Sequence, residues 1–392
     1  MPLDPLRRGP AILAGACLAL AAACAPPECG PAGPTCDRNP DAPGPYAVGV
    51  TTLELSVTRT GVVRKLVTEV WYPAVPARGA THDRYYSADL VTAEAAAIVV
   101  SPVPEEGMEQ EAFRDVPLAK GTPFPLVVFS HGNGGVRFQS YTLTSYLASH
   151  GYVVAAPDHP GDTLSDLILQ GGLDPSAMVR SASERPGDVR DVATLLFRGA
   201  GPFTEGTLRD GRYGLFGHSF GASTSFIVAS PGGLGYDARV AAIAPIAPET
   251  DTLTALGDGP PLVQVPTLLV GAQRDRTLDY AQNCRGGYDS ANRPRYLVGV
   301  KNAGHFSFTE ICPLNLAASA DAAGIRGAAK VLSDGCGADF LPSRQVAQVT
   351  SRFVTAFFNG YLREAPSALA YLVPGPTTPQ DVADAVDQDA DP

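Results

Sequence analysis

The residues that point most clearly to a chemical reaction are Gly217-His218-Ser219-Phe220-Gly221, which form a G-x-S-x-G motif. In this motif a strand ends in a sharp turn and a helix follows, so that the serine hydroxyl stands above the end of the strand. Residues 213–216 are apolar enough for a short buried strand, and residues 222–229 are small enough for a helix that packs closely on a sheet. A side chain at either glycine would clash where strand and helix approach each other. The pattern predicts that Ser219 is a nucleophile.

A serine hydroxyl becomes a good nucleophile only when a neighbouring base takes its proton and a carboxylate orients that base. Where the serine lies on this kind of turn, the acid and then the histidine follow it along the chain. Of the six histidines, only His305 comes after Ser219. It follows a strand-like apolar run, residues 296–300, and a short loop. His305 is therefore the expected general base.

The sequence defines the orienting carboxylate less narrowly. Asp275 comes a few residues after the apolar run 266–271, on the loop where a parallel strand would end. Active sites of parallel sheets collect at that edge, so we expect Asp275 to be the acid. The alternatives are Asp279, Glu249 and Asp251.

The negative charge that develops on the attacked carbonyl oxygen needs N–H donors. One is expected from the backbone of Phe220, directly after the nucleophile, and the other from the loop after the third strand. Residues 125–130 are that strand, and His131-Gly132-Asn133-Gly134-Gly135 is the loop. By position the second donor is the N–H of Asn133, with Gly134 next. The loop lacks the glycine spacing and the lysine of a phosphate-binding loop.

Taken in order, these motifs resemble the α/β-hydrolase superfamily, and within it the bacterial dienelactone-hydrolase-like proteins related to platelet-activating-factor acetylhydrolases. The resemblance covers residues 46 to 363 and implies a mostly parallel sheet of about eight strands with helices on both faces. It also implies a Ser-His-Asp triad that cleaves carboxylic esters through an acyl-enzyme. The residues that carry it are Val70-Trp71-Tyr72-Pro73, 129–135, 156–161, Arg185-Pro186-Gly187-Asp188, 217–221 and Ala303-Gly304-His305-Phe306.

Two features separate the relatives. In platelet-activating-factor acetylhydrolases the resemblance places the acid of the triad after the preceding strand, where this chain has Pro245 to Asp251. In polyester and dienelactone hydrolases it places the acid where this chain has Asp275. Dienelactone hydrolases proper carry cysteine in place of Ser219, so serine favours ordinary ester hydrolysis. We expect a serine hydrolase of short- or medium-chain acyl esters. The alternatives are an acetylhydrolase-like phospholipid deacylase, a cutinase-like polyester hydrolase and a non-catalytic surface lipoprotein that kept the fold.

Apolar runs alternate with helical stretches, as expected for a parallel sheet covered on both faces. Two early runs joined through Thr60-Gly61 predict an antiparallel hairpin at one edge. A helix is expected from residue 184, with Ser183 as its N-cap and an ion pair between Arg185 and Asp188. The expected strands are 47–57, 62–72, 125–130, 153–157, 213–217, 240–246, 267–271 and 296–300, and the expected helices are 137–150, 184–197, 219–229 and 343–363.

Two long connections, residues 73–124 and 164–178, carry apolar side chains and little basic charge. Both emerge near the loop ends, so we expect them to roof the pocket with apolar surface. Such a pocket favours neutral acyl esters over highly anionic substrates.

The termini predict export to the bacterial cell envelope. Arg7-Arg8 precede a short apolar run, and Ala21-Ala22-Ala23-Cys24 is similar to a lipobox, so residues 1–24 are expected to be a signal peptide with Cys24 as the lipid anchor. Residues 25–45 then form a Pro/Gly-rich tether, residues 46–364 the catalytic domain and residues 365–392 an acidic disordered tail.

Seven cysteines are consistent with export. Cys17 and Cys24 belong to the expected signal peptide and anchor, and a disulfide between Cys29 and Cys36 could close a small loop in the tether. Of the other three we prefer a disulfide between Cys284 and Cys312, with Cys312–Cys336 nearly as favoured.

The net charge of −11, without a basic cluster, argues against nucleic acid as a partner. His131 and His159 flank the expected pocket, but no metal-binding spacing occurs, and neither a metal nor a cofactor is expected. The expected partners are an ester substrate and, through the anchor, a membrane.

Overall fold

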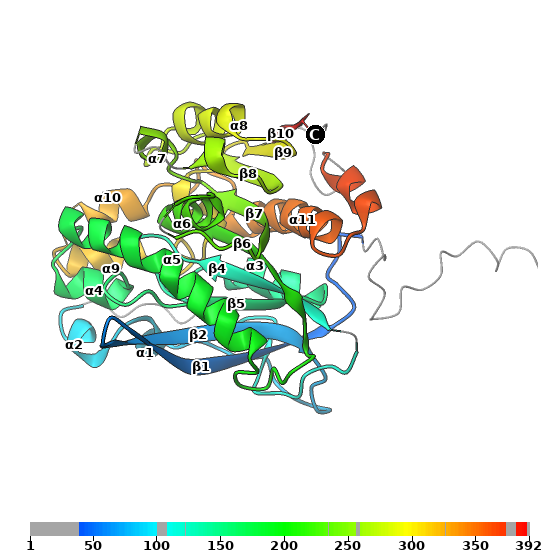
Figure 1. Ribbon diagram of the computed structural model, residues 1–392. Coiled ribbons are helices and arrows are strands. Elements are labelled where there is room, and N and C mark those ends of the chain that lie inside the picture. The colour runs from blue at the N-terminus through cyan, green and yellow to red at the C-terminus, as the bar shows by residue number, and fades with distance from the viewer. Residues whose placement is uncertain are drawn as a thin grey trace, which may run out of the picture.

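A mixed sheet runs through the part of the chain that the computed structural model describes, which comprises residues 39–99, 108–121, 123–233, 235–255, 259–325, 327–373 and 382–389. Within these residues the sheet has ten strands in the order β10-β9-β8-β7-β6-β4-β5-β2-β1-β3 (Figure 1). The six strands from β5 to β9 in this order are parallel neighbours. The fold is that of an α/β-hydrolase, as the motifs predict.

The expected strands are all present. The strands are β1 Ala47–Arg59, β2 Val62–Ala74, β3 Phe113–Arg114, β4 Phe124–Ser130, β5 Val153–Pro157, β6 Leu208–His218, β7 Val240–Ile246, β8 Thr267–Ala272, β9 Arg295–Val300 and β10 Ala383–Asp389. The α-helices are α1 Ser87–Leu90, α2 Ala93–Ala96, α3 Tyr141–Ser149, α4 Leu164–Leu169, α5 Pro175–Phe197, α6 Phe220–Ala229, α7 Asp251–Ala255, α8 Gly286–Ser290, α9 Leu316–Ala322, α10 Ala328–Leu332 and α11 Ser343–Tyr361. Shorter turns are η1 Pro260–Leu262, η2 Tyr280–Arg285, η3 His305–Phe308 and η4 Pro366–Tyr371.

The sheet is buried on both faces because helices cover each of them. On one face α3 and α11 pack against side chains such as Phe129 and Phe216. On the other face α5, α6 and α8 pack against side chains such as Leu126 and Leu215. The central strands therefore consist of continuous apolar runs, as parallel strands covered on both sides do. The hairpin of β1 and β2 pairs antiparallel at the edge, which confirms the prediction from Thr60-Gly61.

The start of the long helix α5 was predicted wrongly. It begins at Pro175, and Asp174 caps it by accepting the N–H of Ser176, so Ser183 lies inside the helix. Proline is most common in the first turn of a helix, whereas Pro186 lies in the interior of α5.

The prediction of disorder for residues 365–392 is also wrong where the structure describes them. The turn η4 packs on α11 and buries Ala368 and Leu372. Residues 383–389 add an antiparallel strand, β10, to β9. Without it the N–H and C=O groups of β9 would lie unpaired at a sheet edge, so backbone pairing orders a segment whose composition indicates only charge.

The tether is shorter than predicted, since residues 39–45 contact the domain. The hydroxyl of Tyr146 donates to the carbonyl of Pro40 at 2.7 Å, and Arg352 pairs with Asp41 at 2.6 Å. The signal peptide, Cys24 and the pair Cys29 and Cys36 lie outside the described residues, and their roles stay predictions. In the described residues no helix is both long and apolar enough to cross a bilayer.

The disulfide joins Cys312 to Cys336, with Cα atoms 5.2 Å apart. The preferred pairing of Cys284 with Cys312 is therefore wrong. Cys284 is a buried thiol in η2 that packs on β8 so closely that a Cβ on Gly271 would lie 2.5 Å from its sulfur. Burial raises the pKa of this thiol.

Candidate active site

Ser219 occupies the sharp turn between β6 and α6. Its backbone has φ 56° and ψ −120°, a conformation that non-glycine residues adopt only where the surroundings enforce it. A Cβ on Gly221 would lie 1.9 Å from the carbonyl oxygen of Ser130, and one on Gly217 would lie 2.4 Å from Gly221 itself. The two glycines of the motif therefore let α6 start directly against the end of β4.

The structure brings Ser219, His305 and Asp275 into one hydrogen-bonded chain. The Nε2 atom of His305 lies 2.8 Å from the hydroxyl of Ser219, and its Nδ1 lies 2.7 Å from Oδ2 of Asp275. The other carboxylate oxygen accepts the N–H groups of Thr277 and Leu278, at 2.9 and 2.7 Å. Because a carboxylate only accepts, Nδ1 carries the proton and Nε2 is left to accept one from the serine.

The alternative acids point elsewhere. Asp279 caps η2 by accepting the N–H of Gln282, and Asp251 accepts the side-chain amide of the same glutamine at 2.7 Å. Glu249 lines the cavity described below, whereas the carboxylate that contacts Nδ1 of His305 is that of Asp275. The geometry therefore favours Asp275.

The second residue of the motif, His218, links the backbone of His305 to the loop that follows β4. Its Nε2 donates to the carbonyl of His305 at 2.8 Å, so its Nδ1 accepts from the amide of Gln139 at 3.0 Å. Gln139 in turn accepts the N–H of Gly132. Burial and the nearby His305 lower the pKa of His218 to about 3, which keeps it neutral and preserves both bonds. The sequence motif did not indicate this role.

The loop after β4 leaves one suitable N–H for an oxyanion. The N–H of Gly132 donates to Gln139, and that of Gly134 donates to Oδ1 of Asp162 at 2.8 Å. The N–H groups of Asn133 and Phe220 have no hydrogen-bond partner in the described part of the chain, and both residues line the cavity beside Ser219. The arrangement agrees with Asn133 and Phe220 as the donors and disfavours Gly134.

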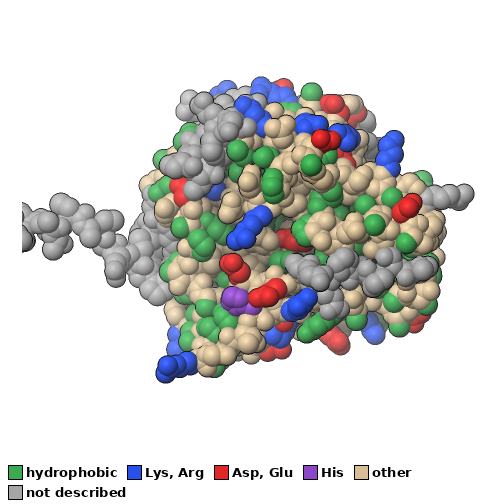
Figure 2. Space-filling model, turned by 180° about the vertical axis from the view of Figure 1, so that it is seen from behind, with side chains coloured by type: hydrophobic (Ala, Val, Ile, Leu, Met, Phe, Trp, Pro, Cys, Tyr) green, Lys and Arg blue, Asp and Glu red, His purple; other side chains and the backbone are tan. Residues whose placement is uncertain are grey.

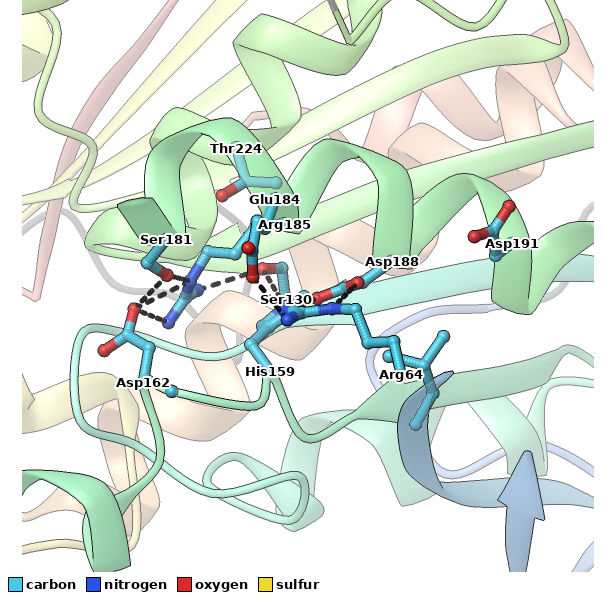
Figure 3. Close-up of polar contacts among 12 residues, drawn as sticks. Arg64, Ser130, His159, Asp162, Ser181, Glu184, Arg185, Asp188, Asp191 and Thr224 are labelled. Atoms are coloured by element: carbon cyan, nitrogen blue, oxygen red, sulfur yellow. Dashed lines mark hydrogen bonds and ion pairs between the residues drawn. The ribbon is translucent and has the colours of Figure 1, made fainter. Parts of the chain in front are cut away.

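A buried ion pair between Arg185 and Asp162 supports this loop (Figure 3). The guanidinium of Arg185, on α5, donates to the carbonyls of His131 and Gly132 and pairs with Asp162 at 2.7 Å. Oδ1 of Asp162 accepts both the N–H of Gly134 and the side-chain amide of Asn133. Arg185 thus holds the carbonyl groups of the loop, and Asp162 holds its N–H groups. The sequence did not predict this role.

The predicted ion pair of Arg185 with Asp188 is wrong, because Arg185 pairs with Asp162 and Asp188 has other partners. It contacts Arg64 at 2.6 Å and Nδ1 of His159 at 2.9 Å (Figure 3). Burial alone would raise the pKa of Asp188, but the hydrogen bonds from Arg64 and His159 lower it to about 2. The other ring nitrogen of His159 lies 2.9 Å from the hydroxyl of Ser130.

The site opens on a cavity of about 450 Å³ whose wall is almost entirely apolar. The connection 164–178 lines it with Leu164, Leu167 and Met178, as predicted. Among the described residues of 73–124, Leu90 is the one that reaches it, and Tyr85 instead stacks on Phe138 inside the core. A third segment, which the sequence did not single out, contributes Ile311, Leu314, Leu316, Val331 and Leu332.

One acid in this wall is held in an apolar setting. Oε1 of Glu310 accepts the N–H of Thr142 at 3.0 Å, whereas its Oε2 is buried without a partner in the described residues. Burial raises the pKa of Glu310 to about 7, against the lowering effect of that hydrogen bond. No group of three or more potential metal-ligating side chains occurs among the described residues.

Comparison with known proteins agrees with this fold. Residues 36–165 match the family model of platelet-activating factor acetylhydrolase, isoform II. Such an acetylhydrolase from Cavia porcellus is 29% identical over 127 residues, 31% of this chain and 28% of that protein. A ferulic acid esterase from Streptomyces cinnamoneus superposes with a TM-score of 0.58 and 24% identity over 84% of this chain and 94% of its own.

These matches confirm the resemblance to the acetylhydrolases in the first part of the chain and the α/β-hydrolase fold over most of it. The chain matches little more than a quarter of the length of the acetylhydrolase. The matched residues include the loop with Asn133 but end before Ser219, Asp275 and His305.

Replacing Arg185 with lysine should lower kcat about tenfold or more with KM little changed, because a displaced loop weakens an interaction made only in the transition state. The matched control is Arg363→Lys, a buried arginine that also donates to two carbonyls, those of His150 and Gly151, away from the loop. Steady-state kinetics beside thermal unfolding separate the two variants. Equal losses of activity in both would show that Arg185 only stabilises the fold.

Replacing Glu310 with glutamine should stabilise the protein at high pH. A raised pKa in the folded state means that folding favours the protonated acid, so wild-type stability falls as pH rises from the unfolded pKa towards about 7. The stability difference should grow by about 3 kcal/mol across this interval and vanish in acid. Urea unfolding at several pH values measures it. If the stability difference between the variant and the wild type does not change with pH, burial of the Glu310 carboxylate does not destabilise the wild type.

Proposed function

We propose that this protein is a serine hydrolase of carboxylic esters, with Ser219 as nucleophile, His305 as general base and Asp275 as the orienting acid. The observation that carries the proposal is the hydrogen-bonded chain from Asp275 through His305 to Ser219, which ends in an apolar cavity of about 450 Å³. The resemblance of residues 36–165 to platelet-activating factor acetylhydrolases supports the same reaction class.

In the proposed mechanism the hydroxyl of Ser219 attacks the ester carbonyl while Nε2 of His305 takes its proton. The tetrahedral oxyanion accepts the N–H groups of Asn133 and Phe220. The imidazolium then protonates the leaving alkoxide, and an acyl-enzyme remains on Ser219. Water, deprotonated by His305, releases the acid by the same steps in reverse order. Asp275 stays ionised throughout and holds the imidazole in the required tautomer.

The wall of the cavity narrows the substrate class. The side chains with a carboxyl group that line it are Glu249 and Glu310, and neither lysine nor arginine does so among the described residues. An anionic substrate would find no positive charge there, whereas a neutral acyl chain would bury apolar surface. We therefore propose neutral esters of short or medium acyl chain as substrates.

Two narrower substrates remain within this proposal. A short-acyl phospholipid is favoured by the family match of residues 36–165, and an aliphatic polyester by the position of Asp275 after β8. A lipid anchor on Cys24 would place the site at the cell surface, where substrates too large to enter the cell are met. The charged side chains on the face shown in Figure 2 are scattered and of both signs, consistent with a partner other than nucleic acid.

Ser219→Ala should lower the turnover of p-nitrophenyl butyrate by about 10³-fold or more, because it removes the attacking oxygen while the fold is retained. A fluorophosphonate probe should label the wild type at Ser219 and leave the variant unlabelled. A variant that keeps wild-type turnover would exclude Ser219 as nucleophile. A folded wild type with neither turnover nor labelling would favour the non-catalytic lipoprotein.

Asp275→Asn should lower kcat by about 10²- to 10⁴-fold, because the amide favours the wrong tautomer of His305. Asp279→Asn and Asp251→Asn serve as controls and should stay near wild type, since both carboxylates cap or contact Gln282 instead. The measurement is kcat on the same butyrate ester, with thermal unfolding of each variant. A large loss in a control together with normal turnover in Asp275→Asn would move the acid to that residue.

A further inference from the structure

A second cavity, of about 270 Å³, lies beside the first. Helices from all three connections enclose it, and they are grouped at one end of the sheet (Figure 1). Its lining is hydrocarbon except for the side chains of Ser87 and Ser319. The residues that line it are Ser87, Ala88, Leu90, Val91, Ala96, Val99, Leu164, Leu167, Ile168, Leu316, Ser319, Ala320, Ile325, Ala328 and Leu332.

Five leucines separate the two cavities, and each of them lines both. They are Leu90, Leu164, Leu167, Leu316 and Leu332. The side chains shared by the two cavities are thus a layer of leucines, none of which carries a charge. Leucine changes between staggered rotamers without covalent strain, so a small rearrangement of this layer would join the cavities.

The helices around the second cavity have a small apolar cluster of their own. Ala95, Ile168, Ala320 and Ile325 form a cluster of their own, apart from the two clusters on the sheet. Small side chains on facing helices leave space between them, whereas protein interiors normally have few voids larger than a water molecule. A hydrocarbon group that occupies an apolar cavity of this size removes apolar surface from water.

The disulfide holds the segment that carries much of this wall. Cys312 and Cys336 close a loop that contains both α9 and α10. Near one end, Asp334 accepts the N–H of Arg276 and the hydroxyl of Thr277, in the loop that follows Asp275. The ends of the segment that carries the two helices are therefore tied to each other and to the loop that follows Asp275.

We propose that the second cavity receives the distal part of a long acyl chain whose ester carbonyl is bound at Ser219. This inference rests on the proposed esterase function and extends its substrates to neutral long-chain acyl esters. Hydrocarbon is the occupant that the lining selects, because the two serine hydroxyls are the only polar side chains in it among the described residues. The shared leucines give the chain a path from Ser219, since they line the catalytic cavity as well.

The test fills the second cavity and leaves the first unchanged. Ala320 lines only the second cavity, and Ala322, two residues along the same helix, is exposed. For Ala320→Trp, the ratio of kcat/KM for p-nitrophenyl dodecanoate to that for the butyrate should fall about tenfold or more. If the tryptophan keeps about two methylenes of the acyl chain out of the cavity, the lost burial lowers the ratio by roughly this factor. The control Ala322→Trp should keep the wild-type ratio.

A second variant covers the possibility that tryptophan disrupts α9. Ala96→Leu enters the cavity from α2 with a smaller side chain and should lower the same ratio by a smaller factor. A wild type that hydrolyses the butyrate but not the dodecanoate would overturn the proposal, as would an unchanged ratio in both folded cavity variants. Loss of butyrate turnover in the wild type would instead refute the esterase function itself, so the two failures are distinguishable.

Discussion

The contact between the turn at Ser219 and the end of β4 is the constraint on which the site depends. Gly221 approaches the carbonyl of Ser130 so closely that no side chain fits between them. This approach sets the first N–H of α6 beside the loop that follows β4, so both expected oxyanion donors face the same space. It also places the hydroxyl of Ser219 in line with His305, which the loop after β9 presents. A looser turn would separate the nucleophile from its donors.

Buried polar groups then maintain this geometry at two levels. Arg185 and Asp162 hold the loop after β4 through its own carbonyl and N–H groups. His218 and Gln139 connect the same loop to the backbone of His305. Burying a charged pair is costly unless its hydrogen bonds are satisfied, and in this pair each partner also bonds to the loop. The network therefore favours one arrangement of the loop over others, in agreement with its place beside the nucleophile.

The wall of the catalytic cavity has a different character from the sheet beneath it. Three connections supply short helices that pack through leucines and alanines, and they leave two adjoining cavities. A sheet covered on both faces is rigid and can hold the catalytic residues, whereas short helices with small side chains can adapt to a chain of variable length. In the proposed function, specificity and catalysis would thus be assigned to separate layers of the molecule.

The sequence alone determined the positions of the eight expected strands, the turn at Ser219 and the pairing of Ser219 with His305, because these follow from local patterns and from chain order. It also favoured Asp275 as the acid, because this residue follows the apolar run 266–271 by only a few positions. Only the tertiary structure decided the partner of Arg185, the disulfide of Cys312 with Cys336 and the pairing of β10 with β9. Each of these joins segments far apart in the chain. Which of several candidates meets depends on how helices pack in space, and no local pattern of residues records that.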